Sequence, residues 1–126
     1  MTKMPTILII DSNRMFRQSL REVIHNRFPE LDITEAQNAN EGLQKAIQDR
    51  PQLIVTDLQL NGLMSFQMIQ KIAQEQPDAH IAVLTDKDEE EYRKVALAKG
   101  ADYFLSKTNP NEQSVLTLIK RRLIDA

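Results

Sequence analysis

The sequence of 126 residues contains no cysteine, which excludes disulfides, thiol catalysis and thiolate metal sites. Its three glycines, Gly42, Gly62 and Gly100, lie far apart, so no glycine-rich loop is present that could cradle a nucleotide phosphate. No apolar run approaches the roughly 18 residues that a membrane span needs, and the first residues show no signal-peptide pattern. These absences predict a cytoplasmic protein that does not contact a membrane.

An excess of charge of one sign is also missing, because the formal net charge is only -2. We therefore expect no direct binding of nucleic acid through a broad basic surface. The basic cluster Lys120-Arg121-Arg122 falls at the end of an expected helix, where cations complement the helix dipole. Hydrophobic residues make up 41% and charged residues 27% of the chain, which is typical of one globular domain over residues 1–126.

Five short segments have the composition of β-strands. Four of them are almost continuously apolar and β-branched, as expected of strands that are buried on both faces. The fifth, Asp32–Ala36, alternates polar and apolar residues, which is typical of a half-exposed edge strand. The four buried runs are Thr6–Ile10, Leu53–Asp57, Ala79–Thr85 and Tyr103–Ser106.

Apolar residues recur at helical spacing after each strand, so five helices alternate with the five strands. This alternation predicts an α/β fold with a parallel five-stranded sheet, specifically a flavodoxin-like (βα)5 doubly wound sandwich with strand order 2-1-3-4-5. We expect Ser12 or Asn13 to cap the first helix, Asn40 to cap the second, Leu58–Gly62 to form a loop with an Asn61-Gly62 turn, Asp86–Glu91 to open the fourth helix, Gly100 to end it, and Asn109-Pro110 to start the last.

Polar residues terminate the four buried runs: Asp11, Asp57, Thr85 and Lys107. In a parallel sheet these four residues share the carboxyl edge, where open α/β sheets bind ligands. Carboxylates suit a hard cation such as Mg²⁺, lysine and threonine suit phosphate oxygens, and a carboxylate can itself accept a phosphoryl group. Any one polar residue at a strand end is commonly structural, but four of complementary chemistry predict a phosphoryl site.

An unrelated flavodoxin-like enzyme or nucleotide binder is a competing hypothesis. The absence of a glycine loop and the aromatic content of 5% count against it. The two histidines, His25 and His80, show no paired ligand spacing that would indicate a metal site.

Four stretches, taken in order, resemble the receiver domain of bacterial two-component response regulators. The similarity extends from Ile7 to about Leu123. The stretches that carry it are Ile7–Asp11, Leu53–Asp57, Val83–Thr85 and Gly100–Lys107, the last with a specific spacing.

The resemblance implies that Asp57 accepts a phosphoryl group from a histidine kinase or a phosphotransfer protein. It implies a Mg²⁺ cofactor held by Asp11, Asp57 and the backbone carbonyl of Gln59, with Ser12 reaching the ion through a water. It places Thr85 and Lys107 in contact with the phosphoryl group.

Further family properties concern signal output. Phe104 matches an aromatic switch residue, and the signal leaves through the face formed by the fourth helix, the fifth strand and the fifth helix. The residues that tune the lifetime of the phosphoryl group match Gln59, Lys87 and, next to the switch threonine, Asp86. The resemblance implies a signalling protein rather than an enzyme, a homodimer through this face, and a C-terminal DNA-binding effector domain in a longer chain.

This sequence departs from the family pattern at two positions of the site. The family has a second acid where this sequence has Ser12, and the loss of that charge lowers the expected Mg²⁺ affinity. The family has a very small residue where this sequence has Asp86. Asn61 and Thr108 replace two prolines of the pattern. A degenerate pseudo-receiver, acting as a phosphorylation-independent protein-interaction module, is therefore the alternative hypothesis.

Overall fold

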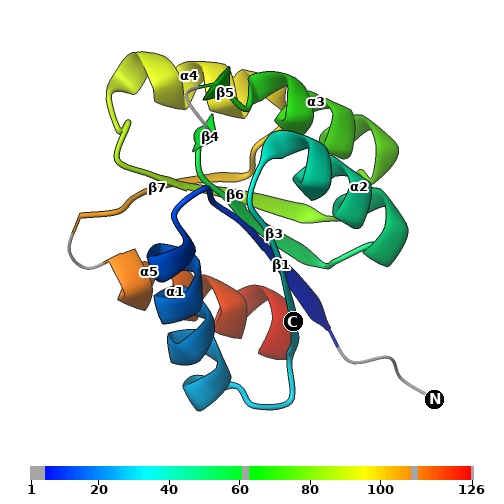
Figure 1. Ribbon diagram of the computed structural model, residues 1–126, viewed down its shortest axis with the longest axis vertical. Coiled ribbons are helices and arrows are strands. Elements are labelled where there is room, and N and C mark those ends of the chain that lie inside the picture. The colour runs from blue at the N-terminus through cyan, green and yellow to red at the C-terminus, as the bar shows by residue number, and fades with distance from the viewer. Residues whose placement is uncertain (1–4, 61–62, 109–110, 126) are drawn as a thin grey trace.

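The computed structural model describes residues 5–60, 63–108 and 111–125. A parallel five-stranded sheet with the order β2-β1-β3-β6-β7 forms its centre (Figure 1). Counted within this sheet, the order is 2-1-3-4-5, so the expected flavodoxin-like fold is confirmed and Asp32–Ala36 is an edge strand. The strands are β1 (Thr6–Ile10), β2 (Asp32–Ala36), β3 (Leu53–Thr56), β6 (His80–Thr85) and β7 (Tyr103–Ser106).

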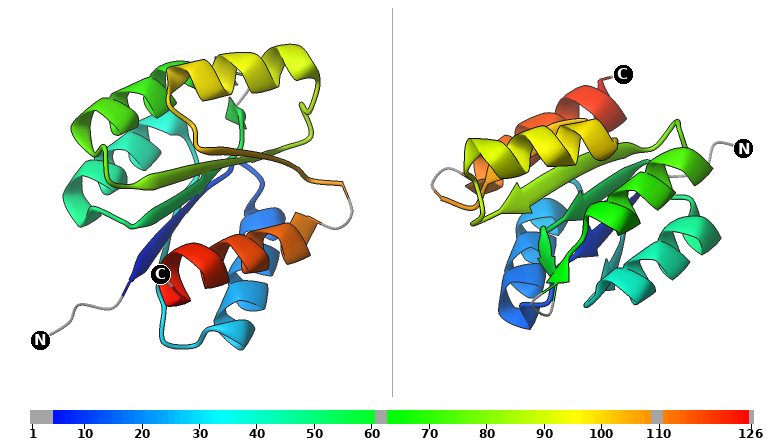
Figure 2. Two further views of the ribbon diagram at one scale, coloured as in Figure 1. Left: turned by 180° about the vertical axis from the view of Figure 1, so that it is seen from behind. Right: turned by 90° about the horizontal axis from the view of Figure 1, so that it is seen from above.

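Helices cover both faces of the sheet (Figures 1 and 2). One face carries α1 and α5 with the π-helix η1, and the other carries α2, α3 and α4. Their bounds are α1 (Arg14–Arg27), α2 (Ala39–Asp49), α3 (Phe66–Glu75), α4 (Glu90–Lys99), α5 (Asn111–Ile119) and η1 (Lys120–Ile124).

The core is divided in two by the sheet because successive strand side chains point to opposite faces. In β1, Ile7 and Ile9 pack with buried residues of α1 and α5, whereas Leu8 and Ile10 pack with those of α2, α3 and α4. All four side chains are at most 1% exposed. This two-sided burial explains why β1 is continuously apolar.

The cap of α2 corrects the sequence prediction. Asn38, and not Asn40, is the N-cap, and its side chain accepts the N–H of Glu41 at 2.8 Å. Starting the helix here puts Glu41 in the third helical position, where its carboxylate accepts the N–H of Gln37 at 3.1 Å. Asn13 caps α1 as expected, through the N–H of Phe16.

The segment after β3 is not a plain loop. The strands β4 (Gln59–Leu60) and β5 (Leu63–Met64) pair in an antiparallel hairpin. The expected Asn61-Gly62 turn lies outside the described residues, as does the expected Asn109-Pro110 start of α5.

The start of α4 also differs from the prediction, since only Glu90 and Glu91 of the acidic run lie in its first turn. The preceding residues are engaged with strand ends instead. The N–H of Lys87 donates to the hydroxyl of Thr85 at 3.0 Å, and Asp88 accepts the hydroxyl of Ser106 at 3.0 Å. Gly100 ends α4 with a φ of 122°, a conformation that glycine adopts without steric cost.

Candidate functional site

A polar pocket of about 280 Å³ lies at the carboxyl edge of the sheet. It collects residues at or just after the ends of β1, β3, β6 and β7, so the side chains expected at this edge do meet. Its lining consists of Asp11, Ser12, Asn13, Asp57, Gln59, Thr85, Asp86, Lys87 and Lys107.

Lys107 joins the two carboxylates of the pocket. Its Nζ lies 2.7 Å from Oδ2 of Asp11 and 3.0 Å from Oδ2 of Asp57. The side chains of Lys107, Asp11 and Asp57 are only 11%, 3% and 12% exposed. The ammonium also lies 4.2 Å from the centre of the Phe16 ring, a cation–π contact that shields it from water.

The charges of this cluster shift two pKa values. Burial raises the pKa of Asp11 above its usual value, against the opposing hydrogen bonds of Lys107 and of the Asn13 amide. Burial alone would lower the pKa of Lys107, but the hydrogen bonds and charges of Asp11 and Asp57 outweigh it and raise that pKa. Lys107 is therefore a fixed positive charge at neutral pH.

Asp57 is held from several directions. Its N–H donates to the carbonyl of Ile10 at 2.9 Å, which continues the β1–β3 pairing by one residue. Its Oδ1 accepts the N–H of Leu58 at 2.7 Å and, more weakly, that of Gln59 at 3.4 Å. These contacts aim the carboxylate into the pocket beside Lys107.

The two residues that were expected to act as switches, Thr85 and Phe104, lie in different places. Thr85 is fully buried at the end of β6 and lines the pocket. Its hydroxyl oxygen accepts the N–H of Lys87. Phe104 is half-buried and packs against the core under α2, α3 and α4. It pairs in register with Val83, two residues before Thr85, and does not belong to the pocket lining.

The oxygen donors of the pocket suit a divalent cation. The Lys107 ammonium contacts Oδ2 of both Asp11 and Asp57, so the two carboxylates point toward the same region of the pocket. Mg²⁺ needs only one or two carboxylates when waters and phosphate oxygens complete its shell. Among the described residues, no group of three or more histidine, aspartate and glutamate side chains is arranged to hold a metal ion.

Two contacts of the site were missed by sequence reasoning. The Phe16 ring covers Lys107, and Nη1 of Arg17 donates to the carbonyl of Asp11 at 2.6 Å. Both side chains project from the first turn of α1, and the Phe16 ring also packs against the core on the α1 face. Their position in the first turn of the helix that follows Asp11 is the signal that could have identified them.

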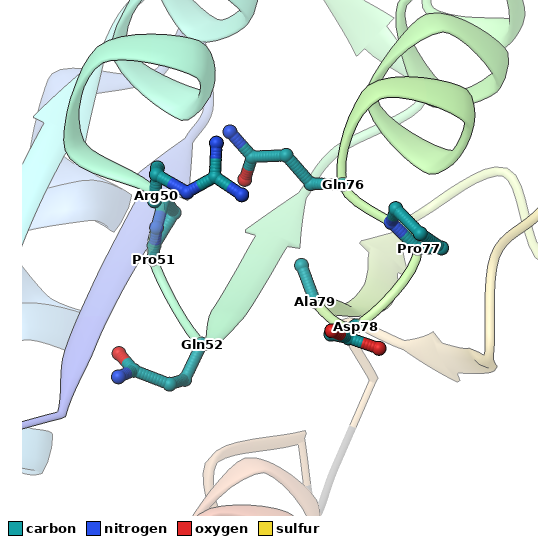
Figure 3. Close-up of a pocket in the computed structure, with 7 residues that line it drawn as sticks. All are labelled: Arg50, Pro51, Gln52, Gln76, Pro77, Asp78 and Ala79. Carbon is teal, nitrogen blue, oxygen red and sulfur yellow. The ribbon is translucent and has the colours of Figure 1, made fainter.

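A second pocket lies at the opposite edge, between the ends of α2 and α3 and the starts of β3 and β6 (Figure 3). Its lining includes Arg50, Gln52, Gln76 and Asp78. Two of these are engaged in the framework: Gln52 accepts the N–H of Thr6 at 2.7 Å, and Gln76 donates to the carbonyl of Ala46. The clustered carboxylates and lysine are found at the carboxyl edge instead.

The strand order and the polar pocket at the carboxyl edge of the sheet define the class of this protein as flavodoxin-like α/β. The chain belongs to this class as a response regulator receiver domain, a family that matches residues 7–120. It is therefore a module of bacterial two-component signal transduction. No described helix is long and apolar enough to cross a membrane.

Individual relatives agree with this assignment. The nitrate/nitrite response regulator protein NarL of Escherichia coli K12 is 31% identical over 103 residues, which cover 81% of this chain and 47% of NarL. The uncharacterized transcriptional regulatory protein YesN of Bacillus subtilis is 27% identical over 115 residues, 90% of this chain and 31% of YesN. The chain thus spans less than half of either relative.

Solved structures also match. A response regulator protein from Burkholderia pseudomallei, crystallised with a phosphorylated aspartic acid, a calcium ion and citrate, has a TM-score of 0.82 and 28% identity. The match covers 94% of this chain and 66% of that one. A CheY-like receiver domain from Methanospirillum hungatei has a TM-score of 0.86 at 23% identity, which supports the fold.

Proposed function

We propose that Asp57 is the phosphoacceptor and takes a phosphoryl group from the phosphohistidine of a histidine kinase or phosphotransfer protein. The observation that carries this proposal is the Lys107 ammonium shared between Asp11 and Asp57 in an open polar pocket. The phosphorylated aspartic acid of the Burkholderia pseudomallei relative supports it. Residues 1–126 form one receiver in this proposal.

In the transfer step, a carboxylate oxygen of Asp57 forms a bond to phosphorus while the phosphorus–nitrogen bond of the donor breaks. The bonding pair leaves with the imidazole nitrogen, and the product is an acyl phosphate on Asp57. Lys107 neutralises the charge of the phosphoryl oxygens, and Thr85 donates its hydroxyl to one of them after releasing the amide of Lys87. Positioning and charge neutralisation are what phosphoryl transfer mainly requires.

Asp11, Asp57 and the backbone carbonyl of Gln59 would hold Mg²⁺, with Ser12 reaching it through a water. When bound, the ion supplies positive charge for the oxygens of the transferring group. Ser12 contributes no charge of its own, so the affinity is lower than two adjacent acids would provide. Gln59, Asp86 and Lys87 surround the phosphoryl position and set how readily water reaches it.

The output begins at Thr85. Movement of this hydroxyl toward the phosphoryl group frees the segment before α4. The side chain of Phe104, which belongs to the neighbouring strand β7, then repacks. The signal leaves through the face of α4, β7 and α5, which also forms a homodimer. In a longer chain, a C-terminal DNA-binding effector domain receives it, as expected from the partial coverage of the regulatory relatives.

The test is incubation with Mg²⁺ and a small acyl phosphate, followed by intact mass spectrometry. The wild type gains the mass of one phosphoryl group, Asp57→Asn gains none, and Asp11→Asn gains it more slowly. Omitting Mg²⁺ abolishes the gain in the wild type. An unchanged mass together with no response to beryllium fluoride, a phosphoryl mimic, would overturn the proposal.

The pseudo-receiver is the second candidate, and it rests on the low charge of the metal site at Ser12 and on the exposed carboxylate of Asp86. The family match and the phosphorylated relative favour the phosphoacceptor over it. Dimerisation and partner binding distinguish the two functions. For a pseudo-receiver, both are the same in the wild type with acyl phosphate, in the wild type without it and in Asp57→Asn.

A further inference from the structure

Ser65 occupies the N-cap position of α3 but does not cap this helix. It is 2% exposed, and its side chain makes no hydrogen bond to the first turn of α3. Its hydroxyl donates instead to the backbone carbonyl of Asp57 at 2.9 Å. A residue type that normally serves a helix terminus is here directed at the phosphoacceptor.

A second bond makes this contact a clasp across the loop. The N–H of Ser65 donates to the carbonyl of Leu58 at 2.8 Å, so one residue holds both carbonyls that follow β3. The β4–β5 hairpin, which contains Gln59, lies between the two ends of this clasp. Ser65 is in turn anchored to α3, because its carbonyl accepts the N–H of Ile69 at 3.0 Å.

The effect reaches the carboxylate through one rigid unit. The carbonyl oxygen of Asp57 and the N–H of Leu58 belong to the same planar peptide group. Ser65 holds the oxygen end of this plane at 2.9 Å, and the nitrogen end holds Oδ1 of Asp57 at 2.7 Å. Rotation of the plane would therefore displace Oδ1 and turn the carboxylate, including the Oδ2 atom that contacts Lys107.

Thr56 also donates its hydroxyl to the carbonyl of Asp57, at 2.8 Å. Because Thr56 directly precedes Asp57, its bond is local and moves with the end of β3. The bond from Ser65 spans eight residues and comes from the N-cap of α3, so it fixes the peptide plane relative to a helix of the packed core.

We propose that Ser65 is a positioning residue for phosphoryl acceptance, which locks the Asp57–Leu58 peptide plane and thereby the carboxylate of Asp57 and the carbonyl of Gln59. The inference rests on the proposed role of Asp57 and deepens it. Loss of a hydrogen-bond partner behind a metal ligand typically lowers metal affinity roughly 10- to 100-fold. We expect about 10-fold for Ser65→Ala, since Thr56 keeps one bond to the same carbonyl.

The experiment compares the full chain with three variants. Ser65→Ala removes the hydroxyl, Ser65→Thr retains it, and Ile24→Val removes one methyl group from the core on the α1 face, away from the pocket. Urea unfolding verifies that each variant is folded. Mg²⁺ is titrated while the amide resonances of Leu58 and Gln59 are followed by NMR, and the rate of mass gain with a small acyl phosphate is recorded.

Support requires that Ser65→Ala lowers Mg²⁺ affinity and phosphorylation rate by about 10-fold, that Ser65→Thr restores most of both, and that Ile24→Val leaves both unchanged. Wild-type values in Ser65→Ala overturn the inference, as do equal losses in Ile24→Val or a Thr variant as defective as the Ala variant. If the wild type binds Mg²⁺ without being phosphorylated, the proposed transfer fails and the Mg²⁺ titration alone decides on Ser65. If the wild type does neither, both proposals fall.

Discussion

Replacing Lys107 with methionine tests whether one ammonium holds the pocket together. The variant keeps roughly the length of the side chain but removes the charge shared by Asp11 and Asp57, and with it the cation–π contact to Phe16. The partners are 3% and 12% exposed, so their carboxylates would face each other in a poorly solvated space. Breaking a buried pair by removing one partner costs about 3–5 kcal/mol, because the remaining charge is uncompensated.

We expect the lower end of this range, about 3 kcal/mol at pH 7, since Asp57 opens to the pocket. With an m-value of roughly 1–3 kcal/mol per molar urea, the unfolding midpoint falls by about 1–3 M. Mg²⁺ restores part of the loss in proportion to its occupancy of the pocket.

The loss depends on pH with a definite sign. The pKa of Asp11 is already raised on folding, so ionisation of this group costs stability as pH rises through its folded pKa. Without Lys107 this cost grows, and it disappears when Asp11 is protonated. The deficit of Lys107→Met therefore shrinks as pH falls below the folded pKa of Asp11. In the wild type, the raised pKa of Lys107 means that its contribution is complete below 10.5 and is lost as pH rises through the folded value.

The control is Lys120→Met, which breaks an ion pair of similar length, 2.8 Å to Asp125, whose side chains are 51% and 54% exposed. An exposed pair contributes at most about 1 kcal/mol, so this variant stays near the wild type. The reasoning is refuted if Lys107→Met is as stable as Lys120→Met at pH 7. It is also refuted if the deficit is the same at pH 7 and in acid.

Three further predictions concern the metal site, the packing and the helix cap. Ser12→Asp supplies the second acid of the family pattern and raises Mg²⁺ affinity about 10-fold or more in calorimetric titration. Unchanged affinity would contradict the proposed metal position. Gly42→Ala places a Cβ 2.7 Å from Cδ1 of Ile10, and this overpacking costs about 1–3 kcal/mol of unfolding free energy, of which the helix preference of alanine offsets roughly 0.5–1 kcal/mol. Ile10→Val, which lacks Cδ1, relieves part of the clash in the double variant, and a stabilised Gly42→Ala would refute the contact. Asn38→Ala costs about 1 kcal/mol in urea unfolding while Asn40→Ala costs little, and the opposite ranking would restore Asn40 as the cap.

Local pattern was enough for much of this protein. Strands such as Thr6–Ile10 and Leu53–Thr56 are recognisable because burial on both faces demands continuous apolar residues. The alternation of polar and apolar residues in Asp32–Ala36 identified an edge strand, because a partly exposed strand needs apolar residues on its buried side only. The strand ends then predicted which polar residues share one edge, and the pocket contains Asp11, Asp57, Thr85 and Lys107.

Errors arose where two local signals competed or where a distant partner decided the outcome. Asn38 and Asn40 are equally good caps in isolation, and the contact from Glu41 to Gln37 favours Asn38. The acids after Thr85 have helix-start composition. The bond from Ser106 to Asp88, across 18 residues, keeps this part of the chain at the strand ends instead.

The sequence by itself predicted the strand order, because right-handed crossovers between alternating strands and helices allow few topologies. It also determined which edge carries the chemistry and which four residues gather there, because these follow from periodicity and chain direction. Only the tertiary structure decided that the Lys107 ammonium binds the carboxylates of both Asp11 and Asp57, although Lys107 lies 50 residues from Asp57 in the sequence. It alone placed Phe16 over that ammonium and Ser65 behind the Asp57 peptide plane. Such contacts depend on how the helices dock on the sheet and on which rotamers the packing admits, and neither is encoded in local spacing.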